Sequence, residues 1–274
     1  MDWLPVVAGL SVLFIPTFYS LASTIWQMEE YAHGPIILAV AAWLSWKKRA
    51  ALFTAASNPA RAAGFTLLLG SLLIYVLGRS QDISVFEVGS LPLLAAGVLL
   101  AMRGWPALRA FWFPILFLVF MVPLPGVLVD ALTGPLKQSV SEITVHILRL
   151  AGYPIAREGV IITIGQYQLL VADACSGMNS MFSLSALGLL FMYLTARASL
   201  LHNVVILASI LPLAFAANIV RVLTLILITY HFGDEAGQGF LHGAAGMVLL
   251  LACLAGLLLL DAVLSRIAKP GTPA

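Results

Sequence analysis

The chain has 274 residues, of which 61% are hydrophobic and only 9% are charged. A soluble domain of this length cannot bury so much apolar surface, so the composition excludes a water-soluble globular protein. The net charge of +2 gives no reason to expect a nucleic-acid partner. Apolar stretches long enough to cross the ~30 Å hydrocarbon core of a bilayer instead predict an all-α, polytopic membrane helix bundle.

Eight apolar stretches are expected to span the membrane, and the second and fourth are short. They cover residues 4–22, 34–46, 62–78, 89–103, 108–124, 178–196, 203–228 and 240–262. The basic residues between these spans fall on one side, which the positive-inside rule identifies as the cytoplasm. Both termini are therefore expected in the cytoplasm. Residues 1–22 have no basic segment or clear cleavage site typical of a signal peptide, so the first span is expected to be retained.

We expect a single integral membrane domain over residues 1–274, with no appended soluble domain. Its first five spans lie in 1–124 and its last three in 178–274. The segment 125–177 falls on the extracytoplasmic side. Its first part, 127–150, mixes apolar and charged side chains at helical spacing, which predicts an amphipathic helix at the membrane surface.

A break at Gly152-Tyr153-Pro154 ends this amphipathic helix. Two β-branched or apolar runs, 159–164 and 167–171, follow on either side of Gly165-Gln166. Such a pattern predicts a small β-hairpin. The hairpin leads directly into the start of the sixth span.

A polar cluster containing a cysteine stands at that point, Asp173-Ala174-Cys175-Ser176-Gly177. Unpaired N–H groups and the helix dipole at a helix N-terminus favour thiolate over thiol, and the thiolate is the nucleophile. Asp173 or Ser176 is placed to cap the helix, and Gly177 leaves room for a substrate backbone. Taken alone, the cysteine is explained equally well as a small packing residue.

Arg221 lies within the apolar seventh span, three residues after Asn218 and therefore on the same helix face. A charged residue within a span is a functional hypothesis by default, because it is expensive to keep there. A permanently charged guanidinium suits a thiolate, an oxyanion or a substrate carboxylate. Snorkelling to the outer boundary or a structural ion pair remains the alternative explanation.

His242 lies at the outer end of the eighth span. An imidazole titrates near neutral pH, so it is suited to protonate a leaving amine and then to activate a second nucleophile. The spacing Gly239-x-x-x-Gly243 around it is explained by close helix packing, but packing does not explain the imidazole. His242 is a functional candidate because it lies on the same predicted membrane side as Cys175 and Arg221.

Together these residues resemble the signature regions of the exosortase family. The matching elements are Ala174-Cys175-Ser176-Gly177, Asn218-x-x-Arg221, His242-Gly243 and, near the N-terminus, Tyr31-Ala32-His33-Gly34-Pro35. The resemblance covers most of the chain in order and spacing, although Ala32 stands where the family often has serine. Histidine at the third signature resembles exosortases, because archaeosortases usually have arginine there.

This resemblance implies a cysteine transpeptidase-like protease in the bacterial inner membrane, with Cys175, Arg221 and His242 as its catalytic residues. The implied partners are exported proteins with a C-terminal Pro-Glu-Pro sorting signal, a transmembrane helix and a basic tail. Cys175 would form a thioester at the extracytoplasmic face, and water or an envelope molecule would accept the product. Asn218, Asp173, Ser176, Gly177 and His33 would support catalysis or bind substrate.

Three other functions remain open on the sequence alone: a small-solute transporter, a lipid-scaffolding protein, and a membrane acyltransferase that uses the thiol as acyl carrier. A transporter would favour inverted repeats and helices interrupted at the midplane, which the sequence does not show. Trapping the thiol with a thiol-directed probe distinguishes the protease from the acyltransferase, because the adduct carries a peptide in the first case and a fatty acyl group in the second.

The remaining titratable residues point to no cofactor and no metal. Cys253 is expected to be a packing residue deep in the eighth span. The histidines His146, His202 and His231 are expected at interfaces or in loops, without a spacing that suggests a metal site. Glu29, Glu30 and His33 are expected to form a solvated loop, and the alternative is a metal or substrate-recognition patch.

Overall fold

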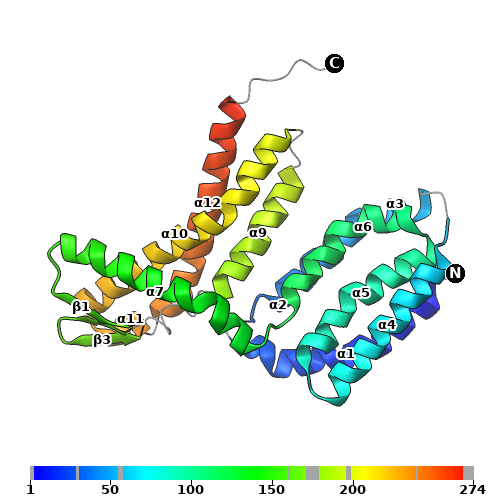
Figure 1. Cartoon of the computed structure of the whole chain (residues 1–274), viewed down its shortest axis with the longest axis horizontal. Helices are drawn as coiled ribbons and strands as arrows, with labels where there is room; N and C mark the ends of the chain where they lie inside the picture. The colour runs from blue at the N-terminus through cyan, green and yellow to red at the C-terminus, as the bar shows by residue number, and fades with distance from the viewer. Residues whose placement is uncertain are drawn as a thin grey trace. The chain divides into compact units, whose positions relative to one another are not determined.

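The computed structural model describes residues 3–28, 31–54, 58–159, 161–170, 179–195, 199–238 and 240–267. Its elements form two compact units, Met1–Pro125 and Gly126–Ala274 (Figure 1). The boundary falls where the sequence predicts that the fifth span gives way to the extracytoplasmic segment. Helices cover most of the described residues in all eight predicted spans.

The described part of the first unit is entirely helical apart from its turns. Its longer helices are α1 (Trp3–Ser23), α4 (Arg61–Ser80) and α5 (Ser84–Met102). The shorter elements are η1 (Ile25–Gln27), α2 (Gly34–Lys47), α3 (Ala50–Thr54), α6 (Trp105–Phe117) and η2 (Leu118–Met121). Helices α2 and α6 each begin with a proline in the first turn, where no backbone N–H is needed for the helix ladder.

Small residues allow α4 and α5 to pack closely as an antiparallel hairpin. A Cβ added to Gly78 would contact the backbone nitrogen of Glu87, and one added to Gly64 would contact the backbone of Ala101. Larger side chains at these positions would push the two helices apart. The close approach brings the start of α5 against the end of α4.

The second unit combines an amphipathic helix, a small sheet and the last three predicted spans. Its helices are α7 (Gly126–Leu150), α9 (Asn179–Thr195), α10 (Leu200–Phe232), α11 (Asp234–Gln238) and α12 (Phe240–Ile267). The helix predicted over 127–150 is confirmed as α7. The predicted break follows it, because Gly152 has a φ of +85°, which glycine adopts without strain. Helix α10 packs against both α9 and α12.

The sheet of the second unit has three antiparallel strands in the order β1-β2-β3. They are β1 (Ile155–Glu158), β2 (Ile161–Ile164) and β3 (Tyr167–Leu170). The predicted hairpin is confirmed as β2 and β3, which turn at Gly165 with a φ of +57°. Strand β1 was not predicted, because its charged residues Arg157 and Glu158 obscure the alternating pattern. It is held by pairing with β2.

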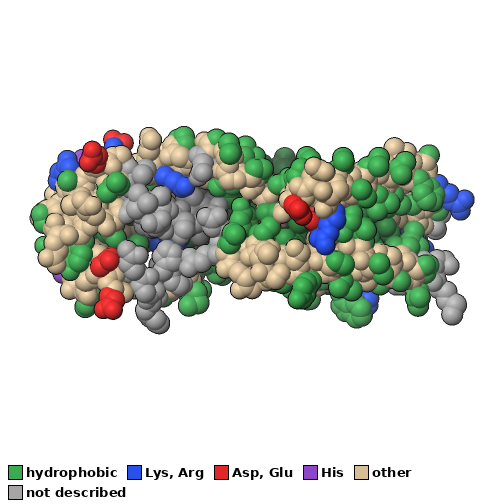
Figure 2. All heavy atoms as spheres, turned by 90° about the horizontal axis from the view of Figure 1, so that it is seen from below, with side chains coloured by type: hydrophobic (Ala, Val, Ile, Leu, Met, Phe, Trp, Pro, Cys, Tyr) green, Lys and Arg blue, Asp and Glu red, His purple; other side chains and the backbone are tan. Residues whose placement is uncertain are grey.

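The helices have the length and surface of membrane spans. Five of them, including α1, α5 and α10, are long and apolar enough to cross a bilayer. The other three predicted spans are shorter apolar helices, 34–47, 105–121 and 182–195 in their described residues. Apolar side chains cover much of the face shown in Figure 2, and large ones such as Leu69 and Leu259 are 63% and 70% exposed. Such exposure suits a hydrocarbon solvent rather than water.

Candidate functional site

Arg221 and Asn218 occupy the buried face of α10. Arg221 is 7% exposed and Asn218 is 1% exposed, although both lie within a helix that is apolar enough to span a membrane. Their spacing of three residues places an amide and a guanidinium on one face, directed into the packed interior of the second unit. The sequence expectation of a shared face is therefore met. Burial also argues against a guanidinium that merely snorkels to the membrane surface.

A buried side-chain pair shows which residues of α12 lie at the same height along the helix axis, here called the level, as residues of α10. Nε2 of His202, near the start of α10, lies 2.7 Å from Oδ1 of Asp261, near the end of α12. Both side chains are almost fully buried. The two helices run antiparallel, so counting 19 residues forward from His202 reaches Arg221, and counting 19 back from Asp261 reaches His242. By this contact Arg221 is level with His242.

A second contact between the same helices places Arg221 against a position about 9 Å farther along α12. A Cβ added to Gly256 would lie 3.3 Å from a δ-carbon of Leu213. Counting eight residues forward from Leu213 reaches Arg221, and eight back from Gly256 reaches position 248. The two contacts together place Arg221 level with the segment 242–248, which is the N-terminal part of α12. The structure describes the backbone of His242 within that part.

The start of α9 lies at the same level of the bundle. A Cβ added to Gly188 of α9 would lie 2.7 Å from Cγ1 of Ile210 on α10. Counting nine residues back from Gly188 reaches Asn179, the first residue of α9, and nine forward from Ile210 reaches Ile219. Asn179 is therefore level with a position two residues before Arg221. The starts of α9 and α12 and the buried Arg221 gather at one end of the three-helix group.

The cysteine cluster itself lies outside the described residues. Asp173, Cys175, Ser176 and Gly177 all belong to 171–178, and their predicted roles stay predictions. Cys175 precedes Asn179 by four residues in the sequence. Four residues span at most ~14 Å even when fully extended, so the chain length allows Cys175 to reach the level of Arg221.

His33 belongs to the first unit, whereas Asn218, Arg221 and His242 belong to the second. Nε2 of His33 lies 3.2 Å from the carbonyl oxygen of Phe120, and the hydroxyl of Tyr31 donates to the carbonyl of Leu124 at 3.1 Å. These contacts tie the start of α2 to the segment that follows α6. The neighbouring Gly34 is also explained locally, because a Cβ there would collide with the indole ring of Trp26.

The His202–Asp261 pair corrects one sequence expectation. His202 was expected at an interface or in a loop, but it is 6% exposed and lies in the first turn of α10, where Ser199 Oγ accepts from its backbone N–H at 3.4 Å. The signal that could have found the pair is Asp261, a single acid inside an apolar run. An acid in such surroundings requires a partner.

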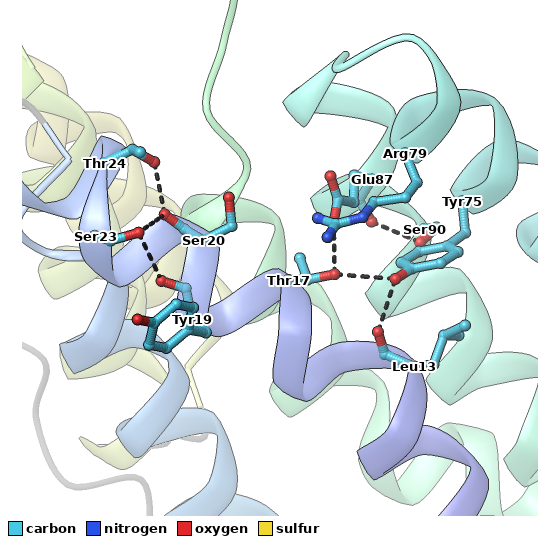
Figure 3. Close-up of polar contacts among 10 residues, drawn as sticks. All are labelled: Leu13, Thr17, Tyr19, Ser20, Ser23, Thr24, Tyr75, Arg79, Glu87 and Ser90. Atoms are coloured by element: carbon cyan, nitrogen blue, oxygen red, sulfur yellow. Dashed lines mark hydrogen bonds and ion pairs between the residues drawn. The ribbon is translucent and has the colours of Figure 1, made fainter.

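A second buried network was also missed, this time in the first unit (Figure 3). Oε1 of Glu87 accepts from the hydroxyl of Thr17 at 2.6 Å and from Nη1 of Arg79 at 3.0 Å. The hydroxyl of Tyr75 lies 3.1 Å from Thr17 Oγ1 and donates to the carbonyl of Leu13 at 2.7 Å. The spans expected at 62–78 and 89–103 leave Glu87 in the loop between them; it lies instead in the first turn of α5 and is 8% exposed.

The described residues hold no candidate metal centre, and the cavity in the first unit is apolar. No group of three or more His, Cys, Asp or Glu side chains in the described ranges is arranged to hold a metal ion. A cavity of about 470 Å³ lies between α1, α2, α5 and α6, and its lining is apolar apart from Ser11 and Ser45. Cys253 is 1% exposed within α12, as expected for a packing residue.

Comparison with known protein families gives a match over most of the chain. The family model described as Transmembrane exosortase (Exosortase_EpsH) matches residues 25–259. No curated protein and no solved structure matches significantly. The matched range includes Cys175, Arg221 and His242.

Proposed function

Since this chain belongs to the transmembrane exosortase family, we propose that it is a membrane-embedded cysteine protease or transpeptidase with Cys175 as its nucleophile. Its substrates would be exported proteins with a C-terminal Pro-Glu-Pro sorting signal, a transmembrane helix and a basic tail. The observation that carries the proposal is the gathering of Arg221 and the starts of α9 and α12 at one level of the bundle. A nucleophile just before α9 and a histidine in α12 can act on the same peptide bond only if the starts of these helices lie close together.

The proposed reaction has two steps. The Cys175 thiolate attacks the scissile carbonyl carbon, and Arg221 stabilises the negative charge on the thiolate or on the oxyanion. His242 then protonates the leaving nitrogen as the C–N bond breaks, which leaves a thioester on Cys175. In the second step His242 takes a proton from the incoming acceptor, the acceptor bonds to the carbonyl carbon, and the thiolate is regenerated.

The remaining candidates would act around this centre. Asp173 or Ser176 would cap α9, Gly177 would admit the substrate backbone, and Asn218 would hold Arg221 or the substrate from the same helix face. His33, which belongs to the first unit, stays a proposed substrate-binding residue. No resident metal or cofactor takes part in the proposed reaction.

The proposed placement in the cell rests in part on the charge distribution. The distribution of basic residues supports cytoplasmic termini and an active site on the extracytoplasmic face, and the bacterial inner membrane is what the family resemblance implies. The acceptor in the second step would be water or an envelope molecule, and bilayer lipid surrounds the protein throughout.

The test is co-expression with a substrate that carries a Pro-Glu-Pro signal, followed by mass analysis of the new C-terminus. Cys175→Ala should abolish processing while the protein still accumulates in the membrane. The matched control is Cys253→Ala, which removes the buried thiol of α12 and should leave processing intact. Normal processing by Cys175→Ala, or a fatty acyl group instead of a peptide on the trapped thiol, would overturn the proposal.

A further inference from the structure

Among the described residues, strand β3 has one edge without a neighbouring strand. It pairs with β2 on its other side, and in the described part of the chain it makes no backbone hydrogen bond to any other segment. In a two-residue hairpin the closing pair, Ile164 and Tyr167, exchanges hydrogen bonds. The backbone N–H and C=O of the next residue, Gln168, therefore point away from β2. Those of Leu170 point the same way.

The sequence of β1 protects the opposite edge of the sheet, whereas the sequence of β3 contains no such protection. Natural edge strands are usually blocked by charged side chains, by proline or by a bulge. Strand β1 follows Pro154 and carries Arg157 and Glu158. Strand β3 is Tyr-Gln-Leu-Leu, which has no charge and no proline, and its register with β2 is unbroken. The sequence thus leaves one edge able to accept another strand.

The core of the second unit holds β3 firmly in place. Ile162 and Ile164 of β2 are fully buried, and Leu169 of β3 is 6% exposed on the same face of the sheet. These side chains belong to one hydrophobic cluster with Val140 of α7 and Ile226 of α10. The outer face carries the exposed Gln168. A strand fixed in this way is a preformed template for main-chain hydrogen bonds.

We propose that the free edge of β3 binds the substrate backbone next to the scissile bond as an added fourth strand. Chain length favours this occupant, because Leu170 precedes Cys175 by five residues, which span at most ~18 Å. About five residues of a paired substrate strand cover the same distance. This inference rests on the proposed function, since it assumes that Cys175 attacks the paired chain.

Strand pairing makes a prediction about the substrate that side-chain recognition does not. Successive backbone N–H groups of a paired strand point alternately toward and away from the neighbouring strand. Purified full-length protein in detergent should therefore be assayed with sorting-signal peptides N-methylated at one position at a time. Methylation should lower kcat/KM about 2- to 10-fold at every second position, the loss of one hydrogen bond each. A loss without this alternation overturns the inference.

A matched pair of variants tests the edge from the protein side. Gln168→Pro removes the outward N–H without touching the bonds to β2, and Gln168→Ala measures what the side chain alone contributes. The loss of kcat/KM in Gln168→Pro should exceed that in Gln168→Ala. On the β1 edge, whose Arg157 N–H also points outward, Arg157→Pro should behave like Arg157→Ala. Equal losses in the two Gln168 variants would contradict the inference.

Two further readouts separate the possible failures. If Cys175→Ala abolishes cleavage but the methylation scan shows no alternation, only strand pairing fails. If Cys175→Ala cleaves normally, the proposed function itself fails. Pairing of β3 between two copies of this chain would appear as a dimer that Gln168→Pro converts to a monomer, and that outcome would also reject the substrate as occupant.

Discussion

The two compact units both bury charged side chains among apolar helices, but they hold them differently. In the first unit Glu87 accepts from Thr17 and Arg79, so one carboxylate joins α1, α4 and α5. In the second unit the pair His202–Asp261 joins α10 and α12. Arg221 lies 19 residues beyond His202, at the level where α9 and α12 begin. The buried Glu87 is explained by helix packing, whereas Arg221 stands where the sequence predicts chemistry.

The largest effect is expected at Arg221. Arg221→Gln should lower the rate of substrate processing about 100-fold or more, because removal of a group that stabilises the oxyanion typically has an effect of this size. The measurement is the rate of processing in membranes with equal amounts of protein. Arg266→Gln, in the exposed last turn of α12, is the arginine control and should process normally. Normal processing by Arg221→Gln would contradict a catalytic role and leave Arg221 with a purely structural one.

The next largest effect is expected at the pair that sets the helix level. Asp261→Ala leaves His202 buried without this partner and should destabilise the protein by about 3 kcal/mol. The midpoint of thermal unfolding in detergent measures this loss. The double variant His202→Leu with Asp261→Leu should recover most of the stability, because an apolar pair needs no charge compensation. If the double variant is no better than Asp261→Ala, the pair has a role beyond packing.

A smaller effect is expected where α9 meets α10. Gly188→Ala places a methyl group against Ile210 and should destabilise the protein by about 1–3 kcal/mol. Processing should also fall, because α9 begins four residues after Cys175 and its position affects that of Cys175. Ile210→Ala combined with Gly188→Ala restores space and should recover both stability and processing. Unchanged unfolding and processing in Gly188→Ala would show that the two helices are farther apart than described.

The smallest effect is expected in the first unit. Glu87→Gln keeps an acceptor for Thr17 but loses the charge opposite Arg79, and it should lower stability by about 1 kcal/mol. Arg79→Gln should change the unfolding temperature less, because the side chain of Arg79 is 46% exposed. Both variants should process substrate at the normal rate. A folded Glu87→Gln variant that fails to process would abolish the contrast between the two units.

Local sequence signals predicted the elements whose patterns are strong. The helical spans, the helix over 127–150 and the hairpin at Gly165 all follow from hydropathy, amphipathic spacing and turn chemistry. Strand β1 was missed because two of its four residues are charged. The helical start of α5 was missed because Glu87 reads as a loop residue when its partners are unknown.

The sequence by itself determined the membrane class, the helical architecture and the family, because these depend on composition and on residues close together in the chain. It also identified Arg221 as an unusual charge in an apolar span. Only the tertiary structure showed that Glu87 meets Thr17 and that His202 meets Asp261, since those partners are 70 and 59 residues apart. The same packing sets Arg221 level with the starts of α9 and α12, because the register of antiparallel helices depends on interhelical contacts.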